Sequence, residues 1–313
     1  MPGQPSREEG VRLDCTGYLA PEERVELVSS SLKGVLAVHG RLVLAAGPVQ
    51  PCPWAQNVWL EPTLLRAQSI ADAASQLCAL QRNWWPYSFQ LYRRSELTKD
   101  KLPFVAAKPL RFPEPAPSAP LGSFTWLDGD QVLCSPRCTS PFPNGEPRFV
   151  EFGEDEGPPS RAYLKLFEAL TLFGATPTAG QRCLELGASP GGWTWVLGTL
   201  RSRVLAVDRA PLAPRVARMP GVEQRVGNAF ALTPQSVGPI DWLFSDVICY
   251  PDKLYRYVCS WLDAGLCSNF VCTLKFQGRE HYAAIERFAA LPGSRVVHLF
   301  HNRHELTWLR RPE

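Results

Sequence analysis

The sequence has 313 residues, of which 45% are hydrophobic, and a formal net charge of +3. This describes a globular protein of about two domains, and so small a net charge gives little support to nucleic-acid binding unless basic residues cluster. No apolar run reaches membrane-spanning length and residues 1–10 are polar, so we expect a cytoplasmic protein whose ten cysteines are reduced thiols.

The first fifty residues predict a compact β-α-β-β unit. Residues 16–20 read as a strand, and residues 22–32 carry apolar side chains at helical spacing. Two further apolar runs, 35–38 and 42–45, lie on either side of His39-Gly40-Arg41, which is a hairpin signal. We expect His39 to be a solvated turn residue.

Residues 51–150 contain a helical pattern over 70–80, followed by a stretch in which aromatic and basic residues are interleaved. From 82 to 111 there are seven basic and two acidic side chains, a local net charge of +5. We expect the aromatic side chains to be core residues and several cations to contact RNA phosphates. The aromatic residues are Trp84, Trp85 and Phe89, and the expected phosphate contacts are Arg93, Arg94, Lys99 and Lys101.

The next stretch is rich in proline, with six between 103 and 120, and predicts an extended, irregular segment. Cys134 and Cys138 are spaced like half of a metal site. Because no second pair of ligands lies nearby in the sequence, we expect no metal.

A turn of small residues follows a strand predicted over 183–186. Gly187-Ala188-Ser189-Pro190-Gly191-Gly192 leads into a helix that begins with Trp193-Thr194. Glycine has no Cβ, so the backbone N–H groups of such a turn can approach a ligand closely. A second buried strand ends in Asp208, about 20 positions on, where a carboxylate commonly binds ribose hydroxyls. The pattern predicts a pocket for a cofactor that carries adenosine.

The same turn limits which cofactor fits. It matches neither the G-x-G-x-x-G of dinucleotide-binding proteins nor the G-K-[ST] of phosphate-binding loops. Pro190 removes a backbone N–H at the position where a pyrophosphate would need one. A cofactor without phosphate fits better, and S-adenosylmethionine is the common one. The alternative is an ordinary strand–turn–helix, in which the glycines serve only to reverse the chain.

A tetrad of charged residues is predicted beside this turn: Lys165, Asp246, Lys275 and Glu305. The strands over 241–246 and 270–275 end in the aspartate and the second lysine. Ligands of open α/β sheets bind beyond the carboxyl ends of the strands, so both side chains should point toward the turn. The first lysine lies on an amphipathic helix over 163–172, and the glutamate lies in a final strand over 304–309. A lone strand-end lysine is usually solvated, but the spaced set is a much stronger signal.

From residue 159 onward, the chain carries short motifs that occur together in one family. They are Pro159-Ser160-Arg161, Leu164-Lys165-Leu166, the run from Leu186 to Thr194, Val207-Asp208, Ser245-Asp246-Val247, Leu274-Lys275 and Glu305. With this set, the chain resembles the FtsJ/RlmM group of ribosomal RNA ribose 2'-O-methyltransferases, and the RlmM type most closely. The resemblance covers residues 159–313 well and the earlier half loosely.

The resemblance implies an α/β fold in which smaller α+β modules precede a Rossmann-like methyltransferase domain. Residues 1–50 would be a ferredoxin-like unit and residues 51–150 a THUMP-like RNA-binding module that includes the proline-rich stretch. Residues 151–313 would then be the S-adenosylmethionine-dependent methyltransferase domain.

The resemblance also implies a function, the 2'-O-methylation of a cytidine ribose in large-subunit ribosomal RNA. The partner would be RNA, with no DNA and no membrane. The tetrad would be catalytic, with Lys275 as the proton acceptor. The cofactor contacts would be Gly187, Ser189, Pro190, Gly191, Gly192, Trp193, Asp208, Asn228 and Asp246.

Two positions depart from the family pattern. Asn228 stands where the family usually has an aspartate near the adenine; an amide can still accept a hydrogen bond and also donate one, so binding should survive. Ala162 stands where the family has a serine beside the cofactor, which puts that contact in question. The tetrad is complete, so we still expect activity.

Proton acceptance requires Lys275 to be neutral, whereas a free lysine has a pKa of about 10.4. Lys165 and desolvation would lower the pKa of Lys275, while Asp246 and Glu305 would raise it. Much of the rate should come from holding the hydroxyl and the methyl group in line.

Other functions fit these residues less well. One alternative is a methyltransferase of the same fold that acts on a base or a small molecule. An Asn-Pro-Pro-Tyr-like loop would indicate methylation of a base nitrogen, and this chain has Ser245-Asp246-Val247-Ile248 there instead. A non-catalytic RNA-binding protein that keeps the fold as a scaffold is disfavoured by the complete tetrad. A methyltransferase that acts on another RNA stays open.

Overall fold

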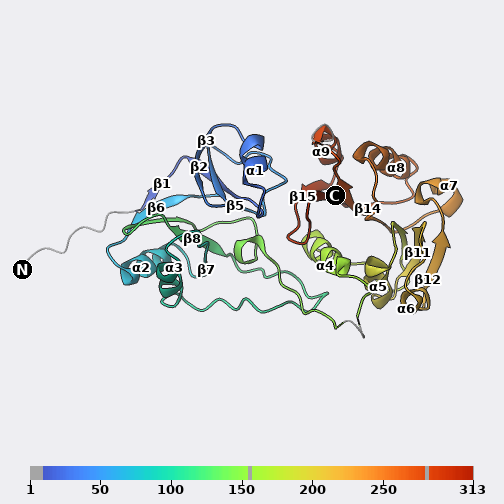
Figure 1. Cartoon of the computed structure of the whole chain (residues 1–313), viewed down its shortest axis with the longest axis horizontal. Helices are drawn as coiled ribbons and strands as arrows, with labels where there is room; N and C mark the ends of the chain where they lie inside the picture. Colours follow the sequence, from blue (N-terminus) through green and yellow to red (C-terminus); the bar gives the residue numbers. More distant parts are fainter. Residues whose placement is uncertain (1–9, 154–156, 279–281, 313) are drawn as a thin grey trace, which may run out of the picture. The chain divides into compact units, whose positions relative to one another are not determined.

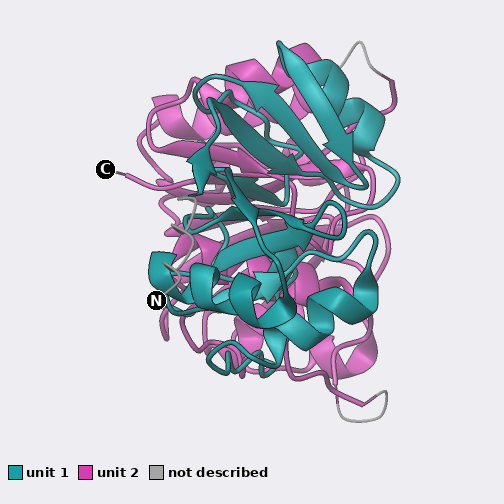
Figure 2. Ribbon diagram, turned by 90° about the vertical axis from the view of Figure 1, so that its left-hand side faces the viewer, with its two compact units in different colours: residues 1–109, 117–148 teal, residues 110–116, 149–313 magenta. Residues whose placement is uncertain are grey.

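The computed structural model describes residues 10–153, 157–278 and 282–312 (Figure 1). The chain forms two compact units, which Figure 2 colours separately. Unit 1 comprises residues 1–109 and 117–148, and unit 2 comprises residues 110–116 and 149–313. The predicted division of the earlier half at residue 50 stays a prediction. Within the described ranges, no helix has the length and apolar character of a membrane span.

The first sheet of unit 1 has four antiparallel strands in the order β3-β4-β2-β5. Its elements are β2 (Cys15–Leu19), α1 (Val25–Ser31), β3 (Val35–His39), β4 (Leu42–Ala46) and β5 (Asn57–Trp59). The predicted β-α-β-β order is confirmed. The helix begins later than predicted because Glu23 has a φ of 61°, which a right-handed helix cannot contain. His39 is half-buried rather than solvated, with its ring 5.9 Å from that of Phe89.

The second sheet of unit 1 has five strands in the order β1-β6-β9-β8-β7. Its elements are β1 (Val11–Arg12), β6 (Thr63–Arg66), α2 (Ile70–Leu80), β7 (Trp84–Pro86), α3 (Tyr92–Lys99), β8 (Gly122–Trp126), β9 (Gln131–Ser135) and the 3-10 helix η1 (Pro143–Gly145). Helix α2 spans the predicted residues. The Ser69 hydroxyl accepts the Asp72 N–H at 3.1 Å and so fixes where the helix starts. Trp84 is buried as predicted, whereas Trp85 and Phe89 are half-buried.

Unit 2 contains a seven-stranded sheet in the order β12-β11-β10-β13-β14-β16-β15. The strands are β10 (Arg182–Leu186), β11 (Arg203–Asp208), β12 (Val222–Val226), β13 (Trp242–Ser245), β14 (Asn269–Lys275), β15 (Ser294–Val297) and β16 (Glu305–Arg310). The strands from β12 to β14 are parallel, and β16 is antiparallel to both its neighbours. Strand order reverses between β10 and β13, and this switch point is where such sheets bind ligands. The predicted Rossmann-like α/β fold is confirmed.

In unit 2, α4 (Ala162–Phe173) precedes the first strand of this sheet, and the other helices lie between its strands. These are α5 (Gly192–Thr199), α6 (Pro214–Ala217), the 3-10 helix η2 (Ala229–Ala231), α7 (Pro234–Val237), α8 (Pro251–Asp263) and α9 (Ala283–Ala289). Helix α4 packs against α5 and also contacts β16. It ends at Gly174, whose φ of 76° places it in the left-handed region that closes helices.

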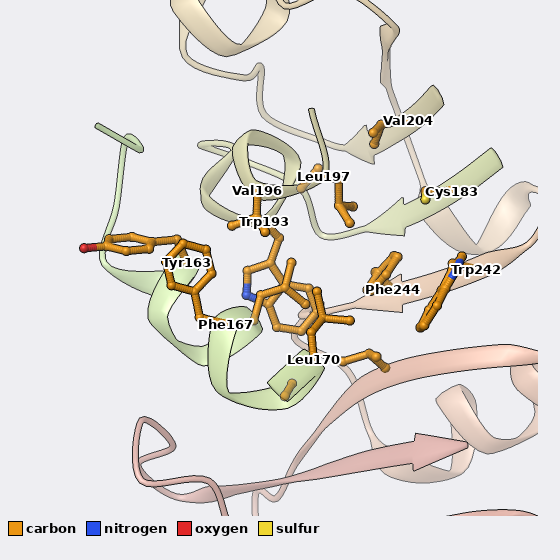
Figure 3. Packing of buried hydrophobic residues seen from close by; sticks show 14 of the residues in the cluster. Tyr163, Phe167, Leu170, Cys183, Trp193, Val196, Leu197, Val204, Trp242 and Phe244 are labelled. Atoms are coloured by element: carbon orange, nitrogen blue, oxygen red, sulfur yellow. The ribbon is translucent and has the colours of Figure 1, made fainter. Parts of the chain in front are cut away.

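One hydrophobic core of unit 2 lies between α4, α5 and one face of the sheet (Figure 3). Phe167 of α4 and Trp193 of α5 point into this core, where the indole ring meets Phe244 of β13 edge to face, at 6.4 Å between ring centroids. The Trp193 indole N–H also donates to the Ala162 carbonyl at 2.9 Å. This packing fixes α4 relative to the parallel strands, and α4 carries one residue of the predicted tetrad.

Candidate active site

The small-residue turn leaves β10 at the switch point of the sheet. Gly187 donates its backbone N–H to the Val207 carbonyl at 2.9 Å. Its φ is +79°, and a Cβ at this position would lie 2.6 Å from the Val247 Cα. Both facts require glycine, because any side chain would be strained and would push the backbone after β13 away.

The carboxylate of Asp208 holds this turn in shape. It accepts the Ser189 N–H at 3.0 Å on one oxygen and the Ala210 N–H at 3.0 Å on the other. The Asp208 side chain stays partly exposed at the carboxyl end of β11. Each carboxylate oxygen has a second lone pair, so the group can still accept hydrogen bonds from a ligand.

A cavity of about 410 Å³ opens over the turn. Its lining contains six of the predicted site residues: Gly187, Ser189, Asp208, Asn228, Asp246 and Lys275. The volume is within the range of small-molecule sites, and the position is where the fold predicts one. The structure therefore brings together the strand ends that the sequence singled out.

The other four predicted cofactor contacts are not among the residues that line this cavity. Pro190 is exposed, and Gly191 packs so closely on Val216 that a Cβ would be 3.0 Å from it. A Cβ on Gly192 would be 2.6 Å from the Ser160 hydroxyl. Trp193 is a core residue. Gly191 and Gly192 thus allow the start of α5 to pack closely against its neighbours.

Asp246 lies at the centre of the charged tetrad. Lys165 donates to its two carboxylate oxygens at 3.3 and 3.5 Å and also forms an ion pair with Glu305. Lys275 donates to the Asp246 carbonyl at 2.6 Å, and its Nζ is 3.0 Å from the carboxylate. All four side chains are at most 22% exposed. The tetrad is thus one connected network of two lysine and two carboxyl side chains.

Strand register explains how distant residues meet. Lys275 and Glu305 are directly paired across β14 and β16. Asp246 follows β13, the other neighbour of β14, and donates its N–H to the Leu186 carbonyl at 3.1 Å. Since α4 contacts β16, Lys165 can reach between the two carboxylates.

Several cavity residues escaped the sequence reasoning. They are Arg209, Gly227, Ala229, Phe230, Val247, Ile248, Cys249 and Lys253. The Lys253 Nζ lies 4.3 Å from the centre of the Phe230 ring, a cation–π contact at the edge of the cavity. The sequence contains one signal for Phe230, because asparagine commonly precedes a helical turn and Phe230 lies two residues after Asn228. In the structure, Asn228 caps η2 by accepting the Phe230 N–H at 3.2 Å.

A buried carboxyl group lies beneath the site. Glu185 of β10 is 2% exposed and accepts a hydrogen bond from the Thr194 hydroxyl at 2.7 Å. Burial raises the pKa of Glu185 to about 8, although the Thr194 bond acts in the opposite direction.

The four cations expected to contact RNA have two kinds of environment in the structure: two lie over tryptophan rings and two are exposed. The Arg94 guanidinium lies 4.1 Å from the centre of the Trp126 ring, and the Lys99 ammonium lies 4.2 Å from that of Trp85. Lys99 also forms an ion pair with Glu96 at 3.3 Å. Arg93 and Lys101 are exposed.

Comparison with known proteins shows which proteins this chain is similar to. Residues 158–265 match the model of the FtsJ-like methyltransferase family. The chain is 35% identical over 182 residues to the ribosomal RNA large subunit methyltransferase M of Aromatoleum aromaticum, which covers 53% of this chain and 48% of that protein. It is 30% identical over 257 residues to the protein of the same name from Xanthomonas oryzae pv. oryzae, which covers 76% and 69%.

Solved structures are more distant. A ribosomal RNA methyltransferase from Plasmodium falciparum covers 49% of this chain and 96% of its own, with 14% identity and a TM-score of 0.37. Fibrillarin from Aeropyrum pernix, solved with S-adenosyl-L-methionine, covers 59% and 81%, with 20% identity and a TM-score of 0.35.

The assignment of this chain to a family rests on its sequence relatives. This chain spans about half the length of the Aromatoleum aromaticum relative and more than two thirds of that from Xanthomonas oryzae. It is identical to the latter at nearly one position in three over most of its own length. The chain therefore belongs to the ribosomal RNA large subunit methyltransferase M family, which carries an FtsJ-like methyltransferase domain.

Proposed function

We propose that this protein transfers a methyl group from S-adenosylmethionine to a ribose 2'-hydroxyl, in a cytidine of large-subunit ribosomal RNA. The observation that carries the proposal is the Lys165–Asp246–Lys275–Glu305 network, which lies at the edge of the cavity over the switch point. The names of the relatives support the same reaction and substrate.

The residues of the cavity fit S-adenosylmethionine. Gly187 leaves open the space that a Cβ would fill, and Asp208 offers carboxylate oxygens suited to a ribose diol. Phe230 adds an aromatic surface suited to an adenine. Bound there, the cofactor supplies a methyl group on a positively charged sulfur, so the chain itself has only to present and activate the acceptor.

In this proposal, Lys275 takes the proton of the hydroxyl. Its Nζ makes two contacts with Asp246, one with the carbonyl and one with the carboxylate. A neutral amine has two hydrogens and one lone pair. In its neutral form, Lys275 would donate one hydrogen to the Asp246 carbonyl and keep its lone pair for the proton of the substrate hydroxyl. Lys165 is enclosed by two carboxylates and instead positions Asp246.

The test is methyl transfer by the purified full-length protein. Labelled S-adenosylmethionine and deproteinised large-subunit ribosomal RNA are the substrates, and Lys275→Met is the matched variant. The expected product is one labelled nucleotide whose 3' phosphodiester bond resists alkaline cleavage, because alkaline cleavage needs a free 2'-hydroxyl. Label on a base would contradict the proposal. So would a labelled nucleotide whose 3' phosphodiester bond is cleaved by alkali. Mapping that nucleotide tests the cytidine.

We also propose that unit 1 contributes to RNA binding through Arg93 and Lys101, and that the protein acts in the cytoplasm. Both side chains are exposed on or just after α3, within the stretch of local charge +5. Arg94 and Lys99 lie over tryptophan rings, so we expect them mainly to stabilise unit 1. The cytoplasmic location follows from the proposed ribosomal substrate and from ten cysteines present as free thiols.

A further inference from the structure

A second cavity lies on the other side of the charged tetrad. It has a volume of about 340 Å³ and is lined by Arg161, Ala162, Leu164, Lys165, His301, Arg303 and Glu305. Two members of the tetrad line this cavity, and the other two, Asp246 and Lys275, line the cavity over the switch point. The tetrad therefore lies between two cavities, and one of them is assigned to the cofactor by the proposed function.

Among the described residues, one charged side chain that lines the second cavity has no ion-pair partner. Lys165 and Glu305 form an ion pair with each other. Arg161 makes a bidentate pair with Glu151, at 2.5 and 2.9 Å. Arg303 is exposed, and among the described residues no carboxylate forms an ion pair with it. An exposed guanidinium without such a partner, on the wall of a cavity beside reactive groups, is suited to bind a phosphate.

The segment that carries Arg303 is held firmly. Glu168 of α4 is 2% exposed, and its carboxylate accepts the Phe300 N–H at 2.8 Å and the His301 N–H at 3.1 Å. The Nδ1 atom of His301 lies 2.7 Å from the same carboxylate. These contacts attach the segment between β15 and β16 to α4, so Arg303 is presented from an anchored backbone.

We propose that this second cavity binds the RNA next to the target nucleotide, and that Arg303 contacts a backbone phosphate there. The inference rests on the proposed function, because it takes the first cavity as the cofactor site. An RNA strand that enters from this side would bring its 2'-hydroxyl to the tetrad while its phosphate remains at Arg303. Such a contact would orient the hydroxyl as well as add affinity.

The experiment compares Arg303→Ala with Arg218→Ala in the full-length protein. Arg218 is also an exposed arginine of unit 2, located at the end of α6, so the change of charge is matched. Binding of deproteinised large-subunit ribosomal RNA is measured over roughly 50 to 200 mM salt, and cofactor affinity is measured by calorimetry. We expect Arg303→Ala to weaken RNA binding about tenfold and to reduce the salt slope by about 0.7 to 0.9. Cofactor affinity should not change.

Arg303→Lys separates charge from shape. Lysine keeps the positive charge but lacks the planar fork of the guanidinium. We expect this variant to retain the wild-type salt slope, with RNA affinity between those of wild type and Arg303→Ala.

Two results would overturn the inference. If Arg303→Ala matches Arg218→Ala in RNA affinity and salt slope while wild type transfers methyl groups, the second cavity is not a phosphate site and the proposed function stands. If wild type neither binds the RNA nor transfers methyl groups to it, the proposed function fails and the inference fails with it.

Discussion

Lys165 and Glu168 lie three residues apart on α4, and they bind the first residue of β16 and the segment that leads into it. Lys165 pairs with Glu305 at the start of that strand, and Glu168 accepts the backbone N–H groups of Phe300 and His301. Side chains three apart share one face of a helix, so a single face of α4 positions this wall of the site. Stability and catalysis should therefore both depend on this face, through different residues.

Glu168→Ala should destabilise the protein. The change leaves two backbone N–H groups and an imidazole without their buried acceptor, which should cost about 3 kcal/mol. Urea unfolding would measure the loss. Glu223→Ala is the control, since Glu223 forms an exposed pair with Arg225 and should change stability by less than about 0.5 kcal/mol. If both changes lowered the free energy of unfolding equally, the buried contacts of Glu168 would contribute no more to stability than an exposed ion pair does.

Lys275→Met should abolish methyl transfer while leaving both binding steps intact. Methionine keeps much of the apolar stem but has no proton acceptor, so single-turnover rates should fall by about 10²-fold or more. Lys275→Arg should fail as well, because a guanidinium stays protonated. Lys33→Met removes the same charge at an exposed position of unit 1 and should be fully active. Near-normal transfer by Lys275→Met would mean that positioning alone carries the reaction.

Asp208→Ala should lower the affinity for S-adenosylmethionine by at least about tenfold, because charge-assisted hydrogen bonds to the ribose are lost. The variant also loses the acceptor of the Ser189 and Ala210 N–H groups, so Asp208→Asn provides a milder comparison. Asp263→Ala, at an exposed position at the end of α8, controls for the change of charge. Calorimetry that finds equal affinity in Asp208→Ala and wild type would remove this residue from the cofactor site.

Glu185→Gln should change how stability depends on pH. The pKa of Glu185 is raised from 4.5 to about 8 by burial, so between these values the folded state holds a proton that the unfolded state has lost. Stability relative to Glu185→Gln should then fall as pH rises from 4.5 to about 8, and stay constant above that. Urea unfolding at a series of pH values measures the difference. Parallel curves for wild type and variant would contradict the raised pKa.

Arg93→Ala combined with Lys101→Ala should weaken RNA binding and flatten its salt dependence. Each phosphate contact that is lost should reduce the slope by about 0.7 to 0.9. Cofactor affinity should be unaffected. The double variant Arg218→Ala, Arg256→Ala removes the same charge from exposed positions of unit 2. An unchanged slope in the first double variant would show that these two cations are only a solvated surface.

Much of the local structure follows from the sequence alone. The helix over 70–80, the hairpin around His39 and the strand ends at Asp208, Asp246 and Lys275 depend on side-chain period, turn residues and caps, all of which act over a few residues. The arrangement of the strand ends also follows, because parallel strands place their carboxyl ends at one edge of the sheet. For this reason, six of the predicted site residues could be named in advance and now line a single cavity.

The remaining features depend on tertiary packing. Trp193 directly follows the small-residue turn in the sequence, yet its side chain lies in the core, because the helices and strands that pack around a side chain decide whether it is buried. Lys165 and Glu305 are 140 positions apart, and no local pattern reports that they form an ion pair. Arg94 has the same charge as Arg93, but a tryptophan from β8 lies beneath it. Local patterns specify elements, whereas burial, ion pairs and cavities are properties of surfaces that come together only when those elements pack.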